Sequence, residues 1–229
     1  GLTPSAPISP TRLGAALACP YQFFLTNALG WSEAKDAPDG NEVDPMSYGS
    51  LFHKVAEDFY RAHGAEFVRR KASLADHLIV ATKMACDAFD AFARGYPLGG
   101  DAIHVAQRER LVRDVETLFE YDWNSEAYEF VDVERSFGED EPVVIEIAKG
   151  PVYLRGQIDR IDRMQGGGPL FVRDLKTGKP KPRGRDGGFD VGIDLQLGVY
   201  ALVTEAMAKK WKLSVSRGIE VAYVYPKGY

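Results

Sequence analysis

The segment VYLRGQIDRIDRMQGGGPLFVRDLK (residues 152–176) has the pattern of two β-strands joined by a tight turn, and it decides the predicted fold. Successive side chains of a strand point to opposite faces of its sheet. Asp159 therefore lies on one face of the first strand, and Asp174 and Lys176 share one face of the second. Between them lie residues 165–168 (QGGG), and glycine adopts turn conformations without steric cost. The segment therefore predicts an antiparallel hairpin that carries two aspartates and a lysine.

The register of this hairpin decides whether the aspartates meet. A four-residue turn pairs Met164 with Pro169, and the same register places Asp159 directly opposite Asp174. Opposed side chains have Cβ atoms about 4.5–5.5 Å apart, and like charges there are destabilising by up to about 1 kcal/mol. Such a pair needs a compensating cation, and Mg²⁺ and Mn²⁺ prefer oxygen ligands. On spacing alone, the alternative is a surface hairpin with scattered charges, and a shift of one residue would separate the two aspartates.

Outside the hairpin, helices are predicted first and strands later. Ser9-Pro10 starts a helix to about Leu29, with Leu13, Leu17, Phe24 and Leu25 among its buried side chains. An acidic loop over 32–46 precedes three more helices, and strand-like segments begin at about Glu129. The further helices are expected at 47–63, 74–94, 101–123 and 189–211, with a last strand at 216–226. The order predicts one α/β domain over 1–229, with a helical portion at about 9–123 and a sheet and catalytic core at about 129–225.

Composition narrows the class of protein. The chain of 229 residues is 45% hydrophobic and 27% charged, which is ordinary for a globular protein. No apolar run approaches the roughly 18 residues of a membrane-spanning helix, so no membrane partner is expected. The first residue is not methionine, so we expect a fragment of a larger protein. Two cysteines make no disulfide framework and fit a reducing cytoplasm.

Five motifs, with the two strands of the hairpin counted as one, together resemble the RecB-like branch of the PD-(D/E)XK nuclease superfamily. The core is GQIDRID (156–162) followed by VRDLKTG (172–178), with VERSF (133–137) before it. The other motifs are ACPYQFFL (18–25), YGSLFHKVAE (48–57) and LQLGVYAL (195–202), in the family's order. The resemblance is greatest to the nuclease domains of AddB- and RecB-type recombination proteins. It implies a restriction-endonuclease-like fold, in which helices flank a mixed central sheet and an N-terminal helical portion precedes it.

The resemblance also implies roles for individual residues. It makes His53, Asp159 and Asp174 metal ligands, together with the backbone carbonyl of Leu175, and it makes Lys176 the catalytic lysine. Gln196 and Tyr200 are implied accessory residues, and Glu134 matches a family acid of less certain role. From the residues alone the alternatives stay open, because a lone histidine is more often partly buried than a ligand. Tyr200 could likewise be a core residue and Gln196 a solvated one.

Two departures from the family pattern bear on cofactors. Ile158 stands before the first acid, where the superfamily name has proline. Cys19 occupies the position of one iron–sulfur ligand of some relatives, but no cysteine follows Gln196. A four-cysteine cluster cannot form on this chain alone, so Cys19 is a candidate ligand only if the protein continues. One or two Mg²⁺ or Mn²⁺ ions are therefore the expected cofactors.

A basic run after the hairpin predicts a nucleic-acid partner. Its five cations in ten residues are Lys176, Lys179, Lys181, Arg183 and Arg185. A net charge of −5 does not exclude DNA, because a local basic stripe can bind phosphates on an acidic protein. A solvated loop is the alternative. No G-x-x-x-x-G-K-[ST] string occurs, so a motor would lie elsewhere or in a helicase or recombination partner.

The predicted function is metal-dependent hydrolysis of DNA in recombination or repair, by an exonuclease rather than an endonuclease. The first alternative is an inactive nuclease-like module that binds single-stranded DNA within a larger repair complex. The second is a structural subunit in which the two aspartates never meet.

Overall fold

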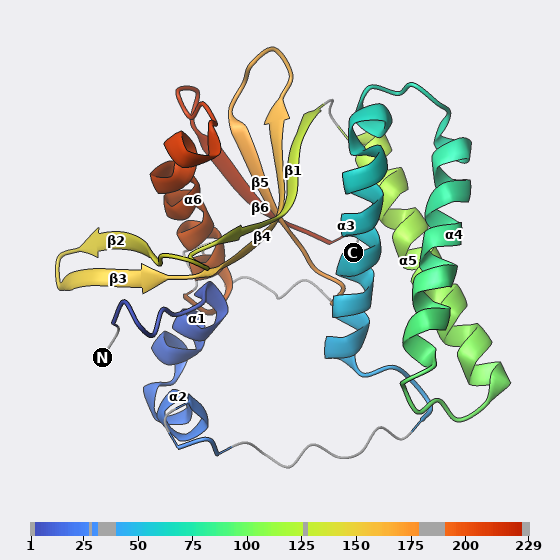
Figure 1. Ribbon diagram of the computed structural model, residues 1–229, viewed down its shortest axis with the longest axis horizontal. Coiled ribbons are helices and arrows are strands. Elements are labelled where there is room, and N and C mark those ends of the chain that lie inside the picture. Colours follow the sequence, from blue (N-terminus) through green and yellow to red (C-terminus); the bar gives the residue numbers. More distant parts are fainter. Residues whose placement is uncertain (1–2, 28, 32–39, 126–127, 179–190, 226–229) are drawn as a thin grey trace, which may run out of the picture. The chain divides into compact units, whose positions relative to one another are not determined.

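The computed structural model describes residues 3–27, 29–31, 40–125, 128–178 and 191–225, with the side chains of 191–194 left out (Figure 1). The chain divides into two compact units. The first comprises residues 1–34, 134–174 and 180–223, and the second comprises 35–133, 175–179 and 224–229. Two of the places where the chain crosses between them lie within β1 (Tyr128–Phe137) and directly before Leu175, the last residue of β5 (Leu170–Leu175). The expectation of a single domain stays a prediction.

Three long helices make up most of the second unit: α3 (Pro45–Val68), α4 (Leu74–Ala93) and α5 (Asp101–Asn124). Their starts follow from the sequence. The Asp44 carboxylate accepts hydrogen bonds from the first amides of α3, and Pro45 occupies a position that needs no amide hydrogen. Ser73 and Asp76 form a reciprocal capping box at the start of α4. The bounds of α4 and α5 agree with the predicted ones to one residue.

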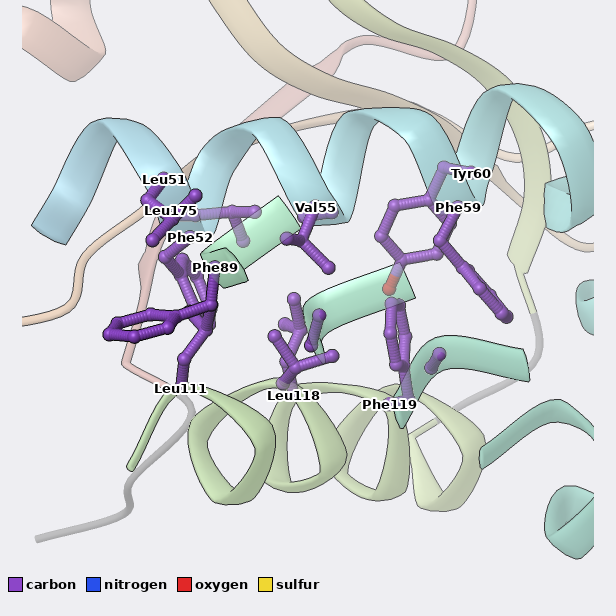
Figure 2. Close-up of a cluster of buried hydrophobic side chains, with 14 of the residues drawn as sticks. Leu51, Phe52, Val55, Phe59, Tyr60, Phe89, Leu111, Leu118, Phe119 and Leu175 are labelled. Atoms are coloured by element: carbon purple, nitrogen blue, oxygen red, sulfur yellow. The ribbon is translucent and has the colours of Figure 1, made fainter. Parts of the chain in front are cut away.

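The core of this unit lies between the three helices. Side chains of α3 point toward those of α5, and the rings of Phe59 and Phe119 have centroids 4.1 Å apart (Figure 2). Leu175 belongs to the same cluster, so the chain directly after Asp174 is anchored in this core. The buried residues include Leu51, Phe52, Val55, Phe59, Tyr60, Phe89, Leu111, Leu118, Phe119 and Leu175.

A mixed sheet with the order β1-β4-β5-β6 holds the candidate acids. The strands β4 (Gly156–Met164) and β5 are antiparallel. The amide of Leu170 donates to Gly218, and that of Lys176 donates to Val224 in β6 (Ile219–Val224), so β5 and β6 run in the same direction. Helices α1 (Pro10–Ala18), α2 (Pro20–Asn27) and α6 (Val191–Trp211) belong to the unit that contains most of this sheet. The predicted mixed α/β fold class is confirmed.

The predicted helix from Pro10 to Leu29 is wrong as a single element. Cys19 has an extended backbone (φ −150°, ψ 93°) and separates α1 from α2, because the ring of Pro20 disfavours a helical conformation at the residue before it. Two residues that were predicted to be buried are exposed: Leu17 is 55% accessible and Phe24 is 52% accessible. Leu13 and Leu25 are partly buried.

The predicted strand over 152–164 is two strands in two sheets. Residues before Arg155 form β3 (Gly150–Leu154), which pairs with β2 (Val143–Ile147), and residues after it form β4. The chain changes sheet where Gly138 lies against the Leu154 carbonyl, at a separation that no Cβ could occupy. The pattern of alternating residues continues across this break, so the break could not be predicted from the pattern.

Several predicted segments lie partly outside the described residues. The structure does not describe the first two residues of the helix expected at 189–211, most of the acidic loop at 32–46, or the last residue of the strand expected at 216–226. In the described part of the chain, no helix is long and apolar enough to cross a membrane.

Candidate functional site

The hairpin has the register that the sequence predicts. Arg160 pairs with Arg173, and the amide of Met164 donates to the carbonyl of Pro169 at 3.1 Å. One further step in this register places Asp159 opposite Asp174. Directly opposed residues of antiparallel strands point to the same face. The aspartates therefore share a face of the hairpin.

The carboxylate of Asp174 is held from helix α6. Asp174 is 1% exposed, and the side-chain nitrogen of Gln196 donates to its Oδ1 at 2.7 Å. The same nitrogen donates to the hydroxyl oxygen of Tyr200 at 2.9 Å. Because Gln196 and Tyr200 are four residues apart, they lie on one side of the helix. The structure thus brings these two predicted accessory residues to the predicted acid.

Burial raises the pKa of Tyr200, and the negative charges of Asp174 and Asp159 raise it further. The hydrogen bond from Gln196 acts in the opposite direction, but it is a smaller effect. Tyr200 is therefore a neutral phenol at physiological pH. The charges of both aspartates thus act on the Tyr200 hydroxyl group.

Glu134 places a further carboxylate close to that of Asp159. It lies in β1 with a positive φ of 48°, which is uncommon for a residue with a side chain, and its carbonyl accepts a hydrogen bond from the Gln157 amide at 3.2 Å. One of its carboxylate oxygens lies within 4.8 Å of one from Asp159. Oxygen atoms so placed could hold a hard divalent cation.

The other described residues of the predicted site lie in the second unit. His53 lies on α3, half-buried, with its ring edge to face against Phe52 at a centroid distance of 6.1 Å. Four residues earlier, Gly49 faces Thr177: a Cβ built at Gly49 would lie 3.7 Å from the threonine Oγ1. The backbone amide of Lys176 donates to Val224 at 2.9 Å. The segment that follows Asp174 therefore runs beside the helix face that carries Gly49.

Two further sets of residues were predicted for the site. The cations Lys179, Lys181, Arg183 and Arg185 lie outside the described residues. Cys19 is a free, half-buried thiol directly before α2, and its sulfur accepts a hydrogen bond from the backbone amide of Gln22 at 3.4 Å. Its iron–sulfur role stays a prediction.

The opposite face of the hairpin carries a buried ion cluster that the sequence argument missed. Asp162 is fully buried, and its Oδ2 lies 2.9 Å from Nε of Arg160 and 3.1 Å from Nε of Arg173. The signal was present in the sequence. Arg160 and Asp162 lie on the face of the strand opposite to Asp159, because successive side chains alternate between faces. The predicted register pairs Arg173 with Arg160, so Arg173 lies on that same face.

A family model described as the PD-(D/E)XK nuclease superfamily matches residues 7–228, and the chain belongs to this superfamily. It is therefore a nuclease-like domain. Among curated proteins it is similar to an AddB-type protein, an ATP-dependent helicase/deoxyribonuclease subunit of Natranaerobius thermophilus, with 28% identity over 214 residues. The match covers 86% of this chain and 17% of that protein. The predicted resemblance is confirmed.

Proposed function

We propose that this chain is a metal-dependent deoxyribonuclease domain that hydrolyses phosphodiester bonds during recombination or repair, as an exonuclease. The observation that carries the proposal is the pair Asp159 and Asp174 on one face of the hairpin, with Glu134 close to Asp159 and Gln196 hydrogen-bonded to Asp174. Neighbouring carboxylates repel one another unless a cation lies between them. The group therefore fits a metal centre better than a solvated surface.

The residues fit a hard divalent ion. Asp159 and Asp174 would be its carboxylate ligands, joined by the carbonyl of Leu175 and by His53, and Glu134 lies close enough to Asp159 to contribute. Oxygen-rich ligand sets suit Mg²⁺ and Mn²⁺, and one histidine suits Mn²⁺. A bound ion, or a pair of them, would polarise a phosphoryl oxygen and lower the pKa of a coordinated water.

The chain's own residues would orient the reaction. Gln196 holds Asp174 in one position, so that carboxylate need not reorganise when substrate arrives. Tyr200 supports Gln196 and, being neutral, adds no charge to the acidic group. The ammonium group of Lys176 would position the attacking water and stabilise the negative charge that develops on the phosphate.

DNA and a helicase or recombination subunit are the proposed partners. The basic residues Lys179, Lys181, Arg183 and Arg185 would contact phosphates without reading sequence. The name of the relative from Natranaerobius joins a helicase to a deoxyribonuclease, which supports a helicase partner. The two free cysteines support a reducing cytoplasm.

A cleavage assay on end-labelled single- and double-stranded DNA, with Mg²⁺ or Mn²⁺, tests the proposal. We expect Lys176→Ala and Asp174→Asn to lower the rate by about 10²–10³, the cost of removing one group that stabilises a transition state. Arg217→Gln, an exposed change away from the acids, should leave the rate unchanged. Wild-type cleavage no faster than that of Lys176→Ala would show that the lysine is not catalytic.

Calorimetry separates the nuclease from the inactive module. The nuclease should bind Mn²⁺, and Asp174→Asn should weaken that binding. Tight binding of single-stranded DNA with no Mn²⁺ binding would instead favour the module that holds DNA without cutting it.

A further inference from the structure

We propose that a second site, a hollow lined by Arg12 and Arg155, binds a nucleotide of the DNA strand through its phosphate and its base, at a distance from the reacting phosphate. This inference rests on the proposed function, because it assigns to that substrate a contact outside the acidic group. The hollow lies within the first unit, has a volume of about 540 Å³, and is formed by the N-terminal segment, α1, α2 and the junction of β3 with β4.

The charges around the hollow favour an anion. Arg12 and Arg155 both line it, both are exposed, and in the described part of the chain neither guanidinium group forms an ion pair. None of the described residues that line it is acidic. Two unpaired cations around one concavity attract an anion, and the effect stands out on a chain whose net charge is −5. Guanidinium groups suit phosphate because their planar geometry can donate two parallel hydrogen bonds.

The remaining lining suits the less polar parts of a nucleotide. Ile8, Leu13 and Phe23 give the hollow an apolar wall, and Ser5 adds a hydroxyl group to its lining. An inorganic anion would leave that wall unused. A sugar and base would cover it, and stacking on an aromatic side chain tolerates any sequence.

The chain itself limits how far this hollow can lie from the acids. Arg155 and Asp159 are four residues apart, so their Cα atoms are separated by at most about 14 Å even in a fully extended chain. Both residues belong to the same compact unit. One continuous DNA strand of a few nucleotides could therefore reach from the hollow to the acidic group. The hollow would then hold the strand while the acids act on it.

The test measures DNA binding without cleavage. The full chain is titrated with a fluorescein-labelled 20-residue oligothymidylate in EDTA, at several salt concentrations, with circular dichroism confirming the fold of each variant. We expect Arg12→Gln and Arg155→Gln each to weaken binding by about fivefold, the upper end for an exposed ion pair. Each should also reduce the slope of log K against log[salt] by about 0.7, the value for one phosphate contact on a single strand. Arg217→Gln, which removes an exposed arginine elsewhere in the same unit, should change neither quantity.

Unchanged affinity and unchanged salt slope in both arginine variants would overturn the proposal. It would also be overturned if inorganic phosphate bound in an arginine-dependent way while DNA affinity did not depend on these arginines, because the hollow would then be a free-anion site. Failure of the proposed function is separate. Asp174→Asn cleaving DNA at the wild-type rate would refute catalysis by the acids, whatever the arginine variants do.

Discussion

Gln196 connects two residues that the catalytic proposal needs, since its amide group donates to both Asp174 and Tyr200. An amide carries two hydrogens on its nitrogen, so both bonds can form at once. The sequence could suggest this pair only by its i, i+4 spacing and its family motif. Which acid the glutamine would contact depended on how α6 packs on the sheet, and spacing along the helix does not contain that information.

For Gln196→Ala we expect Mn²⁺ to bind about 10–100-fold more weakly, the usual cost of losing a group that orients a metal ligand. Calorimetry would measure the affinity, and the cleavage rate at saturating Mn²⁺ would show whether the metal-bound enzyme remains active. Gln165→Ala, in the exposed hairpin turn, is the matched control. Equal Mn²⁺ affinity in wild type and Gln196→Ala would argue against a role for Gln196 in holding Asp174.

His77 gives a second prediction, which concerns stability against pH. It is 5% exposed and packs against Phe59, Phe67 and Trp123. Burial is the main cause that lowers the pKa of His77 below its usual value of 6.5, and the nearby His63 lowers it further, whereas Asp76 and Glu66 act in the opposite direction. The unfolded chain therefore binds a proton at this residue more readily than the folded chain does.

The free energy of unfolding should accordingly fall as the pH drops through 6.5, because protonation favours the unfolded state. Urea denaturation at pH 7.5 and 5.5 measures the fall, and His77→Phe should reduce it. A fall of the same size in His77→Phe would mean that other groups cause the pH dependence.

Among the elements, the β4–β5 hairpin was the most predictable. Its turn sequence and its alternating pattern define the register, and the register defines which residues are opposed. The helices were predictable from their caps and apolar spacing, as for α4 and α5. Pro20 indicates the break at Cys19, but the apolar spacing on both sides of it predicted one continuous helix. The break at Arg155 had none, because it depends on where Gly138, distant in sequence, meets the Leu154 carbonyl.

The contact at Gly138 can be tested against a glycine of nearly the same conformation. Gly138 has φ +74° and Gly166 has φ +73°, so alanine should cost roughly 1–2 kcal/mol of conformational strain at either position. A Cβ at Gly138 would also lie 2.3 Å from the Leu154 carbonyl oxygen, whereas nothing lies within 4 Å at Gly166. Gly138→Ala should therefore lower the free energy of unfolding clearly more than Gly166→Ala, as measured by urea denaturation. Equal losses would mean that the backbone relaxes around the new methyl group.

At the scale of the whole molecule, the chain passes from one compact unit to the other immediately after Asp174. The two consecutive residues Asp174 and Leu175 consequently contact different parts of the fold. The aspartate is bonded to α6, and the leucine is packed in the core with α3. No pattern in the sequence marks this division, because the pairs of residues that define the units are far apart along the chain.

Metal binding should stabilise the whole fold if the carboxylates are assembled only in the native state. The expected gain is about 2.7 kcal/mol when the free ion is at 100 times its dissociation constant. Thermal unfolding with Mn²⁺ should therefore occur at a higher temperature, and EDTA should reverse the shift. Asp174→Asn should respond less. An identical shift in that variant would place the stabilising ion elsewhere on the protein.

The ion cluster behind the hairpin bears on how the chain avoids misfolding. Asp159 and Asp174 occupy one side of the strands, and Arg160, Asp162 and Arg173 are buried on the other. If the register of the two strands shifted by one residue, the side chains of one strand would move to the opposite face of the sheet. Asp162 would then lose at least one arginine, and a charge without its counterpart would remain in the interior, at a cost of about 3–5 kcal/mol. A hairpin in the shifted register would therefore be less stable than the native one. The buried charges would in this way favour the one register in which Asp159 and Asp174 are opposed.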